Sequence, residues 1–281
     1  MGSEVEAKYW MRKPTPELSE VLGLESITEY RIKAIRESAR KLTGNDPEFH
    51  NLRDFVYTKS DLSQGYSKSD LEEKVELRDN RILYEKNALV VRVEKGRKLG
   101  EEYEGMMRLL KRYFNRKKRA GKQRGQANKY TIRIREDKTK HTTYLTMKYK
   151  HGDADEKSEE YEFIIPSRTE GERFLYALGY EYQNGRTKTK KQESYTLRKN
   201  GAVFHIELNR VPGLGTAPFL EIEAVSCSFE RSPDINSVYD LANALGIEEP
   251  ERGRERGGNL ETRGYGKLLR LANGDANGKK L

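Results

Sequence analysis

Apolar and polar residues alternate most clearly in two segments, 204–209 and 219–224, which are separated by a stretch containing proline and glycine. A period of two on both sides of such a break predicts two antiparallel strands joined by a turn. Side chains two residues apart on a strand share a face. The polar positions that share a face are His205, Glu207 and Asn209 on the first strand, and Glu221 and Glu223 on the second.

Three other segments carry charged residues in the same alternating way. They are Glu4, Glu6 and Lys8, then Arg133 and Arg135, then Lys188 and Lys190. Carboxylates side by side on one sheet face repel each other unless a positive charge lies between them, and a divalent cation would supply it. Rows of Lys and Arg on neighbouring strands would hold a polyanion, and a closed or nearly closed sheet would bring all rows around one cavity. The rows therefore predict a site for a metal-bound polyphosphate.

The rest of the chain predicts helices and further strands around these rows. Helical spacing of apolar residues, with caps and stop signals, predicts helices over 17–42, 66–77, from 100 to about 116, and over 166–179, 234–245 and 260–272. Alternation predicts strands over 3–10, 130–136, 142–149 and 159–165, and a hairpin over 81–94.

Six segments resemble, in order and spacing, motifs of the CYTH superfamily, the triphosphate tunnel enzymes. They are the ExExK-like segment 4–8, the LRIR-like segment 130–135, the LTxK-like segment 144–148, the acidic segment 160–162, the segment 206–223 that ends in EIE, and the closing segment 263–269. This resemblance implies an α+β fold, an antiparallel eight-stranded β-barrel with external helices. It implies one domain over residues 1–272, with an inserted helical and hairpin segment at about 60–125. Residues 273–281 are expected to form a disordered tail.

The resemblance also implies a role for each charged row. Residues expected to bind the triphosphate are Lys8, Arg133, Arg135, Lys148, Lys188 or Lys190, and Arg210 as a second phosphate contact. Residues expected to bind Mg²⁺ or Mn²⁺ are Glu4, Glu6, Glu221 and Glu223. Residues expected to be catalytic are Lys8, Glu160 and Glu162, the two glutamates holding a second metal or positioning water. Phosphoryl transfer needs positioning and charge neutralisation, which such a set can supply.

Two positions leave alternatives open. Arg92 could occupy the LRIR position instead of Arg133 and Arg135, although the later pair lies at hairpin distance from the LTxK-like segment. Asn209 stands where the family usually has aspartate, and an amide supplies no charge to a metal.

Three functions fit these residues. The first is metal-dependent hydrolysis of a triphosphate, either inorganic or organic. The second is a class IV adenylyl cyclase reaction, in which the ribose 3′-hydroxyl of ATP attacks the α-phosphorus. The third is a module that binds triphosphates or RNA ends without catalysis. Hydrolysis is the commoner chemistry in the superfamily, so it is the leading prediction.

Composition and net charge indicate which kinds of ligand the protein binds. The chain has 281 residues, a net charge of +9 and 35% charged residues, a balance that favours anionic ligands. No apolar run approaches the ~20 residues of a membrane span, and the amino-terminal residues lack a signal-peptide core, so we expect a cytoplasmic protein. The basic run Lys117–Arg124 either contacts nucleic-acid phosphates or is a solvated helix end followed by a loop.

Overall fold

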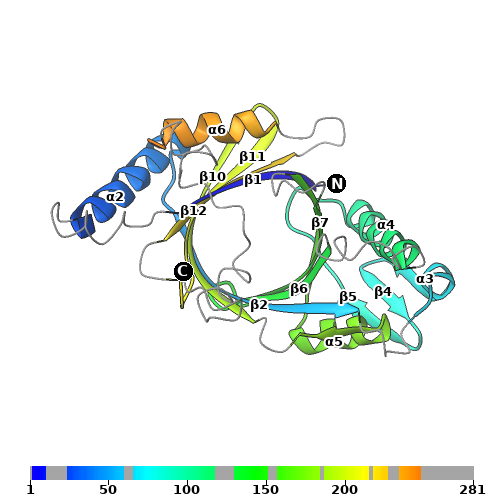
Figure 1. Ribbon diagram of the computed structural model, residues 1–281. Coiled ribbons are helices and arrows are strands. Elements are labelled where there is room, and N and C mark those ends of the chain that lie inside the picture. Colours follow the sequence, from blue (N-terminus) through cyan, green and yellow to red (C-terminus); the bar gives the residue numbers. More distant parts are fainter. Residues whose placement is uncertain are drawn as a thin grey trace. The chain divides into compact units, whose positions relative to one another are not determined.

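The computed structural model describes residues 2–10, 24–59, 66–117, 130–150, 157–183, 187–214, 218–226 and 234–247. The chain divides into two compact units. Unit 1 comprises residues 1–2, 52–153 and 158–188, and unit 2 comprises residues 3–51, 154–157 and 189–281. Most of their elements are labelled in Figure 1.

Unit 2 is built on four antiparallel strands. β1 (Gly2–Trp10) pairs with β12 (Phe219–Ser226), β12 with β11 (Ala202–Arg210), and β11 with β10 (Lys188–Lys199). The helices α2 (Leu24–Thr43) and α6 (Ile235–Ala244) lie on one side of this sheet (Figure 1). The hairpin predicted over 204–224 is formed by β11 and β12.

Alternation along these strands separates an apolar face from a polar one. The apolar face packs against the two helices in one buried cluster that includes Val5, Ala7, Tyr9, Ile32, Ile35, Ile206, Leu208, Ile222, Val238 and Leu241. Burying these side chains removes apolar surface from water, which is the main favourable term in folding. Because successive side chains point to opposite faces, the polar residues between them lie on the face turned away from α2 and α6.

Unit 1 contains its own group of paired antiparallel strands, which we call the unit 1 sheet. β2 (Glu48–Lys59) pairs with β6 (Tyr130–Asp137) and with β9 (Tyr180–Tyr182), β6 pairs with β7 (Thr142–Lys150), and β7 pairs with β8 (Lys157–Ile165). Helices α4 (Leu99–Lys117) and α5 (Arg168–Ala177) cover its apolar face. Their shared cluster includes Met106, Leu110, Ile132, Ile134, Leu145, Met147, Phe163 and Phe174.

The segment predicted as an insertion forms its own elements. It contains α3 (Lys68–Lys74), a sheet of β3 (Val75–Arg78), β4 (Arg81–Tyr84) and β5 (Asn87–Val90), and then α4. Ser67 caps α3, because its hydroxyl accepts from the backbone N–H of Asp70 while the Asp70 side chain accepts from the backbone N–H of Ser67. The predicted hairpin over 81–94 corresponds to β4 and β5.

Eight of the described strands have eight or more residues, and every pairing described between them is antiparallel. With helices on the apolar side of both sheets, the predicted fold class is confirmed. The extent of the domain, 1–272 with an insertion at about 60–125, stays a prediction. The predicted helix over 260–272, the tail 273–281 and residues 118–124 of the basic run lie outside the described residues. No helix in the described ranges is long and apolar enough to cross a membrane.

Close packing of α4 on β8 depends on Gly105. A Cβ added at Gly105 would lie 1.8 Å from Cε1 of Tyr161, a fully buried ring whose hydroxyl is bonded to Arg108 and Glu159. We therefore expect Gly105→Ala to destabilise the protein by about 1–3 kcal/mol, as overpacked cores generally do. Urea denaturation measures the change. Gly100→Ala, in the first turn of the same helix, is the control, because its added Cβ would meet nothing within 4 Å. Equal stability of the two variants would contradict the close approach.

Candidate functional site

The polar face of the unit 2 sheet carries a charged cluster that we call the carboxylate face. It consists of Glu4, Glu6, Lys8, Lys190, Glu207, Asn209, Glu221 and Glu223. Strand register explains the cluster, since Glu6 is opposite Glu223, and both Lys8 and Glu207 are opposite Glu221. Residues directly opposite in an antiparallel pair share a face and lie close together. The sequence rows on β1, β11 and β12 thus meet as predicted from their alternation.

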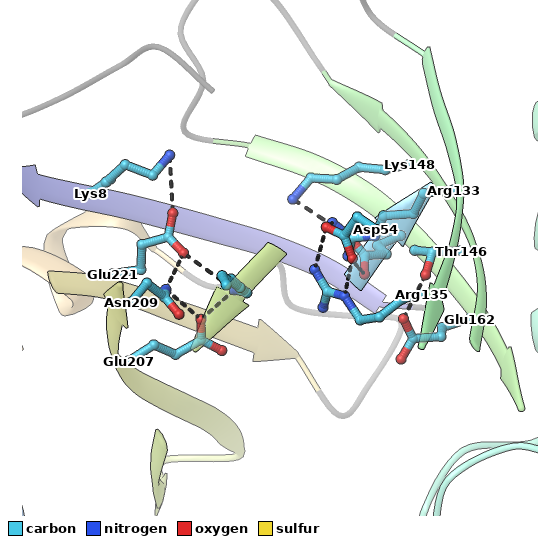
Figure 2. Close-up of polar contacts among 12 residues, drawn as sticks. Lys8, Asp54, Arg133, Arg135, Thr146, Lys148, Glu162, Glu207, Asn209 and Glu221 are labelled. Atoms are coloured by element: carbon cyan, nitrogen blue, oxygen red, sulfur yellow. Dashed lines mark hydrogen bonds and ion pairs between the residues drawn. The ribbon is translucent and has the colours of Figure 1, made fainter. Parts of the chain in front are cut away.

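The ammonium groups of Lys8 and Lys190 lie among these carboxylates, and Figure 2 shows Lys8 beside Glu221. Lys8 Nζ is 3.0 Å from Glu221 Oε1 and 3.6 Å from Glu6 Oε1. Lys190 Nζ is 3.3 Å from Glu207 Oε2 and 3.8 Å from Glu221 Oε2. The cluster therefore holds five carboxylates against two ammonium groups, and Lys188, two residues before Lys190 on the same strand face, adds a third. This surplus of negative charge favours a further cation.

Asn209 is fully buried and joins two of the carboxylates. Its Nδ2 donates to Glu221 Oε2 at 2.5 Å and to Glu207 Oε2 at 3.0 Å. Its Oδ1 is buried and has no hydrogen-bond partner among the described residues. An aspartate at this position would place a further carboxylate against Glu207 and Glu221, whereas the amide donates to both. Asn209 therefore stabilises a close pair of glutamates that aspartate would repel.

The carboxylate face has the donor chemistry of a Mg²⁺ or Mn²⁺ site. Both ions prefer oxygen ligands, and Glu4, Glu6, Glu221 and Glu223 offer carboxylate oxygens, while the Oδ1 of Asn209 offers a buried amide oxygen. Within the described ranges, no three acidic, His or Cys side chains already converge as a metal-ligand set. The residues therefore match such an ion in the type of their donor atoms only.

The polar face of the unit 1 sheet carries a second charged cluster, which we call the guanidinium face. It consists of Asp54, Arg133, Arg135, Thr146, Lys148, Glu160 and Glu162. Arg135 donates to Asp54 through Nε at 2.7 Å and through Nη2 at 3.1 Å, a two-bond geometry that positions the guanidinium firmly (Figure 2). Arg133 Nη2 is 3.3 Å from Glu160 Oε1, and Lys148 Nζ is 3.5 Å from Glu160 Oε2.

Both arginines on this face stay charged. Burial lowers the pKa of Arg135, but the neighbouring Asp54 carboxylate outweighs it and the pKa is raised. Burial and the charge of Arg135 lower the pKa of Arg133, whereas the carboxylates of Glu160 and Asp54 raise it. The carboxylates have the larger effect, so the pKa of Arg133 is raised overall. The Nε of Arg133 is buried and has no hydrogen-bond partner among the described residues. A buried donor of this kind is costly unless an acceptor reaches it, and a phosphate oxygen would be such an acceptor.

The predicted acidic residues Glu160 and Glu162 lie on this same face of β8. Glu162 accepts from Thr146 Oγ1 at 2.7 Å, and its backbone N–H donates to Glu102 of α4 at 3.0 Å. Glu160 contacts Arg133 and Lys148. The structure thus brings the predicted acidic strand together with the LRIR-like and LTxK-like strands inside unit 1.

The other predicted site residues are Arg92, Lys188 and Arg210. Arg92 is exposed and is bonded through its backbone to Ile164, so Arg133 and Arg135, not Arg92, lie on the strand that pairs with β7. Lys188 is half-buried at the start of β10 and shares a strand face with Lys190, two residues later. Arg210 is exposed, and as the neighbour of Asn209 on β11 it points to the opposite face.

Sequence patterns did not identify two residues of the guanidinium face, Asp54 and Thr146, as site residues. They also did not identify Arg97, which contacts Glu102 beside this face. Thr146 could have been found, because it lies two residues before Lys148 and therefore shares its face. Asp54 contacts Arg135, which is 81 positions away in the sequence, so the spacing of neighbouring residues does not indicate that contact.

Several solved structures are similar to this chain. One is the PH1012 protein of Pyrococcus horikoshii OT3, with 16% identity, coverage of 95% of this chain and 99% of that chain, and a TM-score of 0.47. Another is described as a putative adenylate cyclase of Vibrio parahaemolyticus, with 13% identity, coverage of 95% and 97%, and a TM-score of 0.46. A third, from Hippeastrum, is described as a putative adenylyl cyclase with a dominant triphosphatase activity, with 12% identity, coverage of 100% and 97%, and a TM-score of 0.40.

Neither a protein-family model nor a curated protein sequence matches this chain. At these low identities and TM-scores, function has to be inferred from the residues of the two charged faces.

Proposed function

We propose that this protein is a CYTH-type, metal-dependent phosphohydrolase that acts on a triphosphate. The observation that carries this proposal is the placement of the residues in the CYTH-like motifs. These residues are distant in sequence, yet within each unit they lie on the polar face of the sheet and contact one another. Lys8 contacts Glu221 in unit 2, and Arg133 contacts Glu160 in unit 1.

The two charged faces differ in the chemistry that their residues offer. On the guanidinium face, Arg133, Arg135 and Lys148 would bind phosphate oxygens, with the planar forks of the arginines matching two oxygens at a time. On the carboxylate face, Glu4, Glu6, Glu221 and Glu223 would hold Mg²⁺ or Mn²⁺. When bound, such an ion neutralises charge on the phosphates and orients the leaving group.

The remaining residues position the reactants. Lys8 Nζ lies between Glu6 and Glu221, so it can exchange one of these contacts for a phosphate oxygen and stabilise the charge that develops there. Glu162, whose carboxylate is oriented by Thr146, would accept a hydrogen bond from the attacking water. The reaction breaks the bond between the terminal phosphorus and its bridging oxygen, and the water oxygen forms the new bond.

Product identification tests the proposal. The purified protein is incubated with Mg²⁺ and, separately, with tripolyphosphate, thiamine triphosphate and ATP. Release of orthophosphate from at least one of them is expected. Formation of cyclic AMP and pyrophosphate from ATP, with no orthophosphate released, would instead assign the cyclase reaction. Binding of all three without turnover would identify a non-catalytic module and would overturn the proposal.

A further inference from the structure

The insertion contributes one arginine beside the guanidinium face that belongs to none of the motifs. We propose that this residue, Arg97, is a further phosphate-binding group, which takes a triphosphate oxygen in exchange for its contact with Glu102. The inference rests on the proposed function and deepens it, because it assigns a role in substrate binding to the insertion.

Backbone and side-chain contacts hold the segment before Arg97 against this face. The N–H of Arg92 donates to the carbonyl of Ile164 at 2.9 Å, and the N–H of Ile164 donates to the carbonyl of Arg92 at 2.7 Å. Two residues later, Glu94 accepts from the Tyr144 hydroxyl at 3.4 Å. Tyr144 is opposite Arg135 in the β6–β7 pair and therefore shares its face. The segment thus runs beside β8 and reaches side chains of the guanidinium face.

A buried carboxylate connects Arg97 to the acidic strand. Arg97 Nη1 donates to Glu102 Oε2 at 3.4 Å, and the same oxygen accepts the backbone N–H of Glu162 at 3.0 Å. Glu102 is only 2% exposed, and its burial raises the pKa of its carboxyl group. The guanidinium of Arg97 and the backbone N–H of Glu162 therefore donate to the same oxygen, Glu102 Oε2.

The charge and bonding of Arg97 suit a ligand better than a purely structural role. Burial lowers its pKa, but Glu162, Glu102 and Glu160 raise it to a net increase, so the guanidinium is charged. Its one side-chain hydrogen bond among the described residues is the long contact with Glu102. A guanidinium has five N–H donors, so most of its capacity is unused by described residues. Its side chain keeps partial exposure, 28%, through which an anion can reach it.

Calorimetric titration with tripolyphosphate compares Arg97→Ala with Lys98→Ala. Lys98 is the adjacent cation, but its side chain is 79% exposed and pairs with Glu101 on the helix surface. Loss of a charge-assisted hydrogen bond to phosphate predicts about tenfold weaker binding for Arg97→Ala. Lys98→Ala removes the same charge and is expected to bind as the unaltered protein does. Equal affinities of the two variants would overturn the inference.

A second variant separates ligand binding from support of the fold. In Glu102→Gln the amide oxygen can still accept the Glu162 N–H, but the carboxylate that attracts Arg97 is gone. We expect tripolyphosphate to bind at least as tightly as before. If Glu102→Gln weakened binding as much as Arg97→Ala, Arg97 would act only as a brace for Glu102.

The two proposals fail in different ways. If the unaltered protein neither binds nor hydrolyses tripolyphosphate, thiamine triphosphate or ATP, the proposed function and this inference fall together. If the unaltered protein binds and hydrolyses a triphosphate while Arg97→Ala behaves as Lys98→Ala does, only the role of Arg97 is wrong.

Discussion

Replacement of Glu221 by glutamine is expected to abolish triphosphate turnover while the fold stays intact. Glu221 is 7% exposed and contacts Lys8, Lys190 and Asn209, so it lies among the charged groups of the carboxylate face. Glutamine has the same shape and can still accept from Asn209, but it removes the negative charge that a divalent cation needs. Mutation of a residue that only supports a metal ligand lowers metal affinity or activity by about 10–100-fold. For a residue expected to bind the metal directly, we therefore expect the rate of turnover to fall by at least about a hundredfold.

Initial rates of phosphate release at saturating Mg²⁺ measure this loss, and thermal unfolding confirms that the variant is folded. Glu37→Gln is the matched control, because Glu37 lies on α2 with a 64% exposed side chain and only a long contact to Lys33. It makes the same chemical change away from the carboxylate face and should leave the rate unchanged. Full activity of Glu221→Gln would remove Glu221 from the metal site.

Replacement of Arg135 by glutamine is expected to impair both substrate binding and stability. Arg135 pairs with Asp54 through two hydrogen bonds, and both side chains are largely buried. The variant loses both of these charge-assisted hydrogen bonds, while Asp54 keeps Arg133 Nη1 at 3.8 Å, so we expect a loss of stability of about 1.5–3 kcal/mol. Loss of a guanidinium that binds phosphate should also weaken tripolyphosphate binding by about tenfold or more.

A double variant separates these two effects. In Asp54→Asn with Arg135→Gln, no charge is left unpaired, so most of the lost stability should return, as urea denaturation would record. Tripolyphosphate binding should stay weak, because the phosphate-binding group is still absent. If affinity returned together with stability, Arg135 would be a structural residue and the phosphate-binding role of the guanidinium face would lose its main support.

Local patterns were sufficient to predict which residues share a strand face. Glu207 and Asn209, or Arg133 and Arg135, lie two positions apart, and strand geometry alone puts each pair on one side. Turn residues between the strands marked the hairpin of β11 and β12, and so set Glu207 against Glu221 in the pairing. These features of the carboxylate face depend on neighbouring positions in the chain, which is why the sequence contains them.

Contacts that depend on tertiary register were not predictable in the same way. Asp54 meets Arg135 because β2 pairs with β6 in one particular register, although the helices and strands of the insertion separate them in sequence. Glu102 accepts the backbone N–H of Glu162, 60 positions away in the sequence, because α4 packs on β8. A shift of one residue in either packing would remove these contacts without changing any sequence pattern.

The departure at Asn209 has a physical explanation in the structure. The family pattern predicts an aspartate, yet the amide donates to both Glu207 and Glu221 and leaves its own oxygen buried without a described partner. The substitution therefore removes one negative charge and adds a link between two others. Under the proposed function it lowers the charge available to a cation but keeps the glutamates together.

Dependence of phosphate release on divalent cation tests the central claim most directly. Orthophosphate released from tripolyphosphate is measured as Mg²⁺ is raised from a chelated solution to saturation, with the protein shown to be folded throughout. We predict no release under chelation and a rate that rises with Mg²⁺ to a plateau. Equal release with and without chelator, or no release at any Mg²⁺ concentration, would contradict the account.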